Sequence, residues 1–186
     1  GGDRDGNPFV TVATTRNALM ENRKAAVERL EKRLTELIQL ISLSENEVKF
    51  SAEFQARLAL QLDASGQGES IKQRNPQEPF RQHFSALRAR LKEVPGAAPF
   101  RNVAEFIAEL AAAEQSLVEV KAVSIAATLV RPVRWEAEIF GFRTVSLDIR
   151  QNTTVTNRVL QEIWHKMNPL AKMAVPKEGS PEWTAW

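Results

Sequence analysis

The sequence contains no cysteine and only two histidines among its 186 residues. The lack of cysteine excludes disulfides and thiolate metal sites, and neither histidine has a partner at the spacing of a zinc site. No apolar run approaches the roughly 20 residues that a membrane-spanning helix needs, and there is no signal-peptide pattern. These absences fit a reducing compartment, and we expect a cytoplasmic protein without a membrane partner.

The sequence also lacks a large excess of charge of one sign, because it has 25 lysines and arginines and 23 aspartates and glutamates. A net charge of +2 gives no strong case for nucleic acid as a partner. The sequence has no Gly-rich phosphate loop of the Walker or dinucleotide type, no nucleophile elbow and no internal repeat. The chain begins without methionine and ends with two tryptophans in its last four residues. We interpret it as a piece of a longer polypeptide, although a cloning scar would also explain the first two glycines.

Most of the chain has helical periodicity, and its length allows one domain with a real core. We expect a mainly α fold, a long-helix bundle with one or two short strands. The expected order is a polar loop at 1–13, a helical bundle at 14–140, a strand at 143–150, a helix at 153–167 and an irregular tail at 168–186. The expected helix caps are Thr14 or Thr15, Ser51, Asn75 followed by Pro76, and Asn102. A flexible loop is expected at 64–68, and Pro132 is expected to interrupt a helical pattern at about 120–130.

The first long helix carries an apolar seam with steps of three and four residues. It consists of Val27, Leu30, Leu34, Leu37 and Ile41. Such a seam is typical of a coiled coil. It carries the alternative hypothesis of a non-enzymatic helical interaction or scaffold module, which would form an oligomer along it.

The opening loop is the first of two polar spots in the sequence. Asp3 and Asp5 have the spacing of the first ligands of a calcium loop, but Pro8 stands where that loop needs glycine. Thr14 replaces its bidentate glutamate, so the sequence argues against calcium at this loop. The alternative is an ionic knot in which Arg4 is held between the two carboxylates.

The second polar spot is the stretch 143–150, which has the period-two alternation of a strand. Val145, Leu147 and Ile149 alternate with polar residues, and the strand ends on Arg150. Barrel and open-sheet enzymes place ligand-binding groups at this end of a strand. Spacing alone favours the simpler interpretation of an edge strand whose polar face meets water.

Four sequence motifs, taken together, resemble the phosphoenolpyruvate carboxylase family. GGDRDGNP at 1–8 is followed by Val-Thr one residue later, and FGF at 140–142 precedes LDIRQN at 147–152. The segments NPQEPFR at 75–81 and FRNVAEF at 100–106 are similar to connecting segments of bacterial members. The four occur in the family's order. The resemblance reaches from residue 1 to about 165 and covers an interior portion of the full enzyme.

The resemblance implies a fold cut from an α-rich, eight-stranded β/α barrel. It also implies formation of oxaloacetate from phosphoenolpyruvate and bicarbonate with Mg²⁺ or Mn²⁺, in a homotetrameric parent enzyme. Arg150 matches the family's strand-end arginine, which is implicated in holding phosphate or bicarbonate. Asp148 either orients that guanidinium or forms a structural ion pair. For Asp3, Arg4 and Asp5, the resemblance implies structural support of the active site in preference to direct substrate contact.

The sequence differs from the family pattern at several positions and lacks several of the family's motifs. Thr153 stands where the family often has serine, Thr156 where some bacterial members have histidine, and Phe9 where some plant members have a basic residue of an activator site. The family's histidine segment, metal-binding Glu and Asp, second catalytic histidine and late Gly-rich loop are absent from these residues. The sequence therefore predicts an inactive fragment whose partner is the rest of the same polypeptide.

Overall fold

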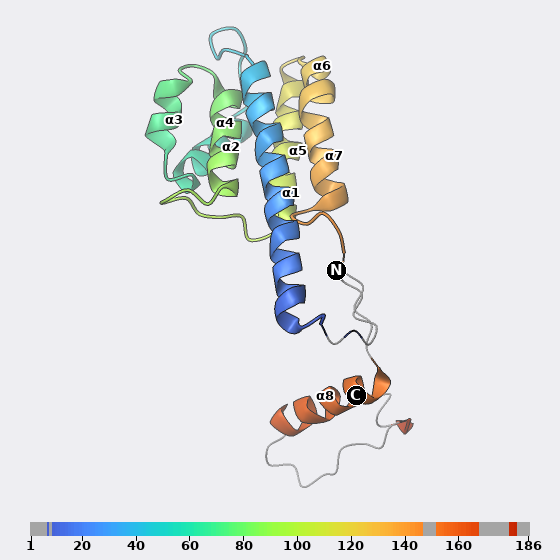
Figure 1. The fold of residues 1–186 in the computed structure, drawn as a ribbon. Helices are drawn as coiled ribbons and strands as arrows, with labels where there is room; N and C mark the ends of the chain where they lie inside the picture. Colours follow the sequence, from blue (N-terminus) through green and yellow to red (C-terminus); the bar gives the residue numbers. More distant parts are fainter. Residues whose placement is uncertain (1–6, 8, 147–151, 168–178, 182–186) are drawn as a thin grey trace. The chain divides into compact units, whose positions relative to one another are not determined.

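The structure is a computed structural model that describes residues 7, 9–146, 152–167 and 179–181. As the periodicity predicts, it is mainly helical (Figure 1). The helices are α1 (Val12–Leu40), α2 (Ala52–Ala64), α3 (Gly68–Arg74), α4 (Pro79–Leu91), α5 (Val103–Glu119), α6 (Val123–Ile125), the π-helical η1 (Ala126–Val130), α7 (Arg131–Phe140) and α8 (Thr153–Met167). None of the helices in this described part is long and apolar enough to cross a membrane.

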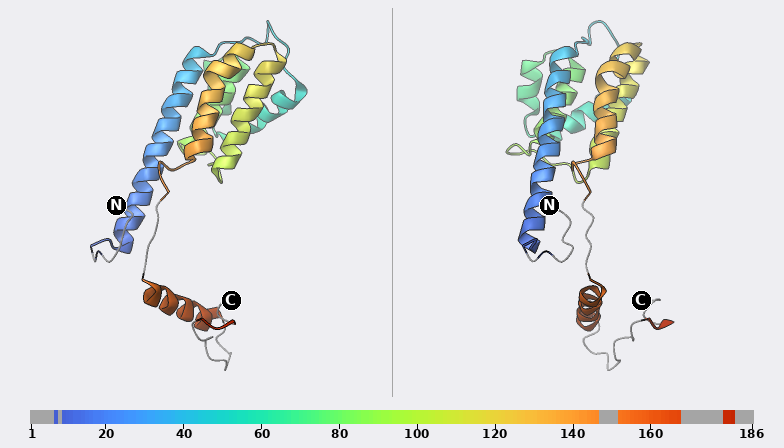
Figure 2. Two further views of the ribbon diagram at one scale, coloured as in Figure 1. Left: turned by 90° about the vertical axis from the view of Figure 1, so that its right-hand side faces the viewer. Right: turned by 45° about the vertical axis from the view of Figure 1, so that its right-hand side comes forward.

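The chain divides into two compact units. One unit is Leu19–Ser146, and the other combines Gly1–Ala18 with Leu147–Trp186. Unit Leu19–Ser146 is a helical bundle in which α2 packs on α4, and α5 packs on η1 and α7. Figure 2 shows α5 and α7 side by side, and ion pairs of Glu136 with Arg29 and Arg33 join α7 to α1.

The apolar seam of α1 lies inside this bundle. Leu30, Leu34, Leu37 and Ile41 are buried, and Val27 is partly buried against the same core. Their partners in the core include fully buried phenylalanines of α4 and α5, each of which contributes about 2 kcal/mol by leaving water. The seam is therefore covered by other helices of the same chain and is not available as an oligomer surface. The scaffold hypothesis itself stays a prediction.

Two of the predicted helix caps are confirmed. Ser51 Oγ accepts the N–H of Phe54 at 3.4 Å, and Asn102 Oδ1 accepts the N–H of Glu105 at 3.0 Å. The sequence predicts the cap of α1 one turn too late. Thr11 Oγ1 accepts the N–H of Thr14 at 3.2 Å, so the helix begins before Thr14. Three threonines within residues 11–15 make the sequence ambiguous, since each can accept such a bond.

The predicted start of a helix at Asn75 and Pro76 is wrong. Asn75 instead ends α3, where its backbone N–H and its side-chain Nδ2 both donate to Ile71 O. Helix α4 begins at Pro79. The preference for proline in the first turn of a helix is therefore met by Pro79 and not by Pro76. Helix α3 was missed because it is seven residues long and buries only Ile71, which leaves no periodicity to detect.

Pro132 does not interrupt the helical path. It lies in the first turn of α7, directly after the π-helical turn η1. Proline removes one backbone donor, and its ring crowds the carbonyl four residues earlier. In the wider π turn the N–H of Arg131 donates to Ala126 O. This turn accommodates the proline ring and the missing donor within one continuous helical path.

The predicted strand at 143–150 is absent from its described half. Residues 143–146 are irregular, and residues 147–150 lie outside the described residues, as does most of the tail 168–186. A strand needs a neighbouring strand for its backbone hydrogen bonds, and the described residues include no strand that could pair with it. The helix predicted at 153–167 is confirmed as α8.

Candidate functional site

The residues predicted for the active site are Asp3, Arg4, Asp5, Asp148 and Arg150, and all five lie outside the described residues. Their roles remain predictions. What the structure describes is the chain on either side of them: the turn that follows the opening loop, the segment that leads toward Arg150, and the start of α8.

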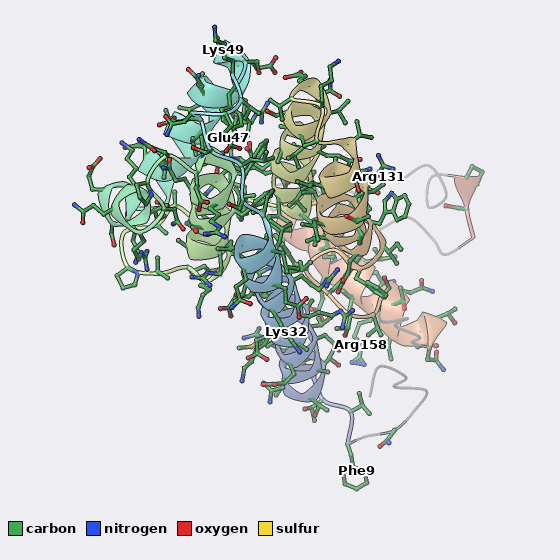
Figure 3. All side chains as sticks on the ribbon, turned by 90° about the horizontal axis from the view of Figure 1, so that it is seen from above. Phe9, Lys32, Glu47, Lys49, Arg131 and Arg158 are labelled. Carbon is green, nitrogen blue, oxygen red and sulfur yellow. The ribbon has the colours of Figure 1, made fainter. Side chains whose placement is uncertain are left out.

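A compact turn connects the opening loop to α1. Asn7 Oδ1 accepts the N–H of Phe9 at 2.9 Å, and the N–H of Val10 donates to Asn7 O at 3.2 Å. The Thr14 hydroxyl donates to Phe9 O at 3.4 Å, which ties the turn to the first turn of the helix. The ring of Phe9 points away from the ribbon and is 83% exposed (Figure 3). Local hydrogen bonds therefore define how the loop enters α1.

Asn152 stands at the start of α8, two residues after Arg150 in the sequence. Its Oδ1 accepts the N–H of Thr154 at 2.8 Å, and its backbone carbonyl accepts the N–H groups of Val155 and Thr156 at 3.0 and 3.1 Å. This is the geometry of a helix N-cap. The final amide of the LDIRQN motif thus has a structural task in beginning α8.

The segment that leads toward Arg150 is anchored on the bundle. Phe142 packs against Phe106 with ring centroids 5.9 Å apart, and the guanidinium of Arg23 lies 5.4 Å from the Phe142 centroid. Thr144 Oγ1 donates to Asn22 Oδ1 at 2.7 Å. Sequence reasoning missed Asn22 and Arg23, because no pattern links a helix near residue 20 to a segment near residue 144.

A small cavity of about 170 Å³ lies between α1, α7 and this segment. It is lined by Ala26, Arg29, Leu30, Glu136, Phe140, Gly141 and Thr144. Glu136, which is 11% exposed at its side chain, forms ion pairs with Arg29 and Arg33 of α1. The charged groups at this cavity are therefore already paired within the protein.

A second ionic group joins α5 to α7. Glu114 accepts from Arg131 Nε at 2.6 Å and from Arg134 Nε at 2.8 Å, and Arg134 also pairs with Glu138 (Figure 3 labels Arg131). Burial alone would raise the pKa of Glu114, but the hydrogen bonds from Arg134 and Arg131 outweigh it and lower that pKa. These ion pairs join α5 to α7, and Glu114 is therefore a structural carboxylate and not a candidate catalytic acid.

His83 lies fully buried between the rings of Phe54 and Phe84, whose centroids are 5.5 Å from its own. Its Nε2 is 3.4 Å from the backbone oxygen of Glu109. Burial lowers the pKa of His83 to about 4, and burial raises the pKa of Glu109 against the opposing charge of Arg57. Arg57 donates to Glu109 Oε1 at 2.8 Å. The prediction that His83 is a surface or core histidine, not a ligand, is consistent with this position.

No group of three or more His, Cys, Asp or Glu side chains able to hold a metal ion occurs within residues 7, 9–146, 152–167 and 179–181. The carboxylates closest to the bundle interior are instead paired with arginines. Glu105 accepts from Arg90, and Glu109 accepts from Arg57. Within the described part, these two carboxylates are therefore ion-pair partners of arginines.

Comparison with known proteins relates the chain to one enzyme family. A family model described as phosphoenolpyruvate carboxylase matches residues 1–179. The chain is 36% identical to the phosphoenolpyruvate carboxylase of Methylorubrum extorquens, in an alignment that covers all of the chain and 21% of that protein. The proteins of the same name from Rhodopseudomonas palustris (strain BisA53) and Nitrosomonas europaea are 32% and 30% identical over 91% and 89% of the chain. The chain spans about a fifth of the length of these relatives.

Proposed function

Because the family model covers residues 1–179, the chain belongs to the phosphoenolpyruvate carboxylase family, and we propose that it is part of a protein that forms oxaloacetate and phosphate from phosphoenolpyruvate and bicarbonate. The observation that carries the proposal is this match along nearly the whole chain. The order of the four motifs, from GGDRDGNP to LDIRQN, agrees with it.

The reaction develops charge on oxygen atoms. An oxygen of bicarbonate attacks phosphorus while the bond from phosphorus to the enolate oxygen breaks, which gives carboxyphosphate and the enolate of pyruvate. Carboxyphosphate then releases carbon dioxide, and the enolate carbon attacks it. A guanidinium offers two parallel donors to a phosphate or carboxylate, which suits this charge.

In this proposal Arg150 contacts the reacting oxygens. Asp148, two residues earlier, orients the Arg150 guanidinium or pairs with it structurally. Asp3, Arg4 and Asp5 support the opening loop near the active site. The LDIRQN motif at 147–152, in which Arg150 stands, supports this assignment.

Mg²⁺ or Mn²⁺ is the metal expected for the family. The described residues do not fit such a site, because their carboxylates do not gather in groups of three or more with one another or with histidine. We propose that its ligands, and the catalytic histidines, belong to other parts of the full-length polypeptide. The partner of this chain is then the rest of that polypeptide, within a homotetrameric protein of the cytoplasm.

The proposal predicts that the 186-residue chain alone is inactive and that the full-length protein containing it is active. The test is phosphoenolpyruvate-dependent incorporation of ¹⁴C-bicarbonate into malate, with malate dehydrogenase and NADH present to trap oxaloacetate. We expect incorporation by the purified full-length protein with Mg²⁺ and none by the chain. Incorporation by the chain alone, or its absence from the folded full-length protein, would contradict the proposal.

A further inference from the structure

Helix α7 has two apolar faces. Val133 and Ala137 are buried in the core of the bundle, whereas Trp135 and Ile139 are 52% and 74% exposed. Residues four positions apart lie on one face of a helix, and two positions turn a helix by about 200°. The pair of Trp135 and Ile139 therefore lies opposite the buried pair. We call Trp135, Ile139 and the adjacent Phe140, which is 47% exposed, the outer face of α7.

The charged residues of α7 are engaged within the bundle. All four form ion pairs with other residues of the chain, and Glu136 and Arg134 reach back to α1 and α5 through Arg29 and Glu114. Figure 1 shows α7 at the edge of the bundle. A helix that meets water on its outer side normally has charged residues there. The outer face of α7 is instead typical of a helix that is covered on both sides.

The outer face is a cluster of apolar side chains. Leu40 and Leu60 are also exposed, but neither has another exposed large hydrophobic residue within four positions of it, which is normal for a protein surface. Phe140, by contrast, adjoins Ile139 in the sequence and lines the cavity of about 170 Å³ together with Ala26 of α1. The apolar surface thus continues from α7 toward α1.

The size of the outer face indicates what kind of partner covers it. An aromatic side chain can bury about 150–250 Å², so Trp135 and Phe140, each about half exposed, leave roughly 100 Å² apiece in water. A stable complex of two separate proteins buries about 800 Å² on each of them. Three side chains are too few for such an interface. They suffice for a segment of the same polypeptide, because its connection to the chain gives it a high effective concentration.

We propose that the outer face of α7 is the docking surface for an apolar segment of the same polypeptide that lies outside residues 1–186. This inference rests on the proposed function in one respect, namely that the chain is part of a longer protein. The chain spans about a fifth of the length of its relatives, so about four fifths of such a protein can supply the segment. The segment is uncharged where it touches α7, because the charges of α7 are already paired and a buried charge without a partner is costly.

The first test is thiol labelling of Ile139→Cys in the folded full-length protein, followed at that position by mass spectrometry. We expect labelling to be at least about tenfold slower than in the same protein unfolded in urea, because a covered thiol reacts only when the contact opens. Leu60→Cys is the matched control, since Leu60 is 68% exposed on α2. It should react within about twofold of its rate in urea. Free labelling at Ile139→Cys, or equal protection at both positions, would overturn the proposal.

The second test identifies the segment that docks. The full-length variant Ile139→p-benzoylphenylalanine is irradiated, and the crosslinked peptides are identified by mass spectrometry. We expect a crosslink to a peptide outside residues 1–186, in a product with the mass of one polypeptide. A product of doubled mass would assign the face to a second copy, and a crosslink to residues 1–18 or 147–186 would assign it to this chain itself. Either result, or the absence of a crosslink, would overturn the proposal. The smaller cysteine of the first test still gives an answer if the large side chain prevents folding.

The outcomes separate this inference from the proposed function, because neither readout is activity. If the unsubstituted full-length protein forms oxaloacetate but Ile139→Cys is labelled freely, the docking surface is wrong and the proposed function stands. If Ile139 is protected and crosslinked as expected but the folded full-length protein forms no oxaloacetate, the proposed function fails and the docking surface stands.

Discussion

Arg150→Ala in the full-length protein should lower kcat by about 100- to 1,000-fold, the usual cost of removing one donor to a developing oxyanion. The guanidinium carries a fixed positive charge and two parallel N–H donors, so it can follow negative charge as it moves between phosphate and carboxylate oxygens. Arg150→Lys should recover only part of the loss, because an ammonium keeps the charge but not the paired donors. Steady-state rates of oxaloacetate formation measure both variants.

The matched control for Arg150 is Arg158→Ala. Arg158 lies on α8, is exposed and is close to Arg150 in the sequence (Figure 3). Its loss removes the same charge from a nearby position and should leave kcat within about twofold, because an exposed charge has little effect through water. Near-normal turnover and substrate affinity in a folded Arg150→Ala protein would refute the assignment.

Acidification should destabilise the bundle through His83. The pKa of His83 is lowered from 6.5 to about 4 by burial, so between these values the unfolded chain binds one more proton than the folded chain. Stability from this group is therefore complete above pH 6.5 and is lost as the pH falls toward 4. The loss is about 3 kcal/mol, because each unit of pKa shift corresponds to about 1.4 kcal/mol.

Urea unfolding of the 186-residue chain at several pH values measures this dependence. His83→Phe keeps an aromatic ring among Phe54 and Phe84 but cannot titrate, so its stability should fall less steeply below pH 6.5. Glu109 works in the opposite sense, because burial raises its pKa, so folding makes its protonation easier than in the unfolded chain. If His83→Phe has the same slope as the wild-type chain, the acid sensitivity does not come from His83.

The helices that the sequence predicts well are those with a long apolar stripe and a clear cap. Helices α2 and α5 begin after Ser51 and Asn102 as predicted, and α8 has the predicted bounds. The failures have local causes. Helix α3 is too short to show a period, and Pro132 is accommodated by a π turn that no simple propensity indicates. A strand depends on partners that its own residues do not reveal.

The candidate site divides in the same way. Arg150 and the opening loop were found through family motifs, because an arginine at the end of one apparent strand is ambiguous by itself. The contacts of Arg23 with Phe142 and of Asn22 with Thr144 could not be found from the sequence, since they form only when residues 142–144 lie beside α1 in the fold. The buried contact of His83 with Glu109 likewise joins α4 to α5 and becomes visible only when the two helices pack.

The most direct measurement of the central claim uses bicarbonate labelled with ¹⁸O on all three oxygens, with unlabelled phosphoenolpyruvate and the full-length protein. If bicarbonate attacks phosphorus, one labelled oxygen stays on phosphate when carbon dioxide leaves, and the other two enter oxaloacetate. Mass spectrometry early in the reaction should therefore find inorganic phosphate with one ¹⁸O for each oxaloacetate formed. Phosphate without label, or phosphate released without oxaloacetate, would contradict the function proposed for the protein to which this chain belongs.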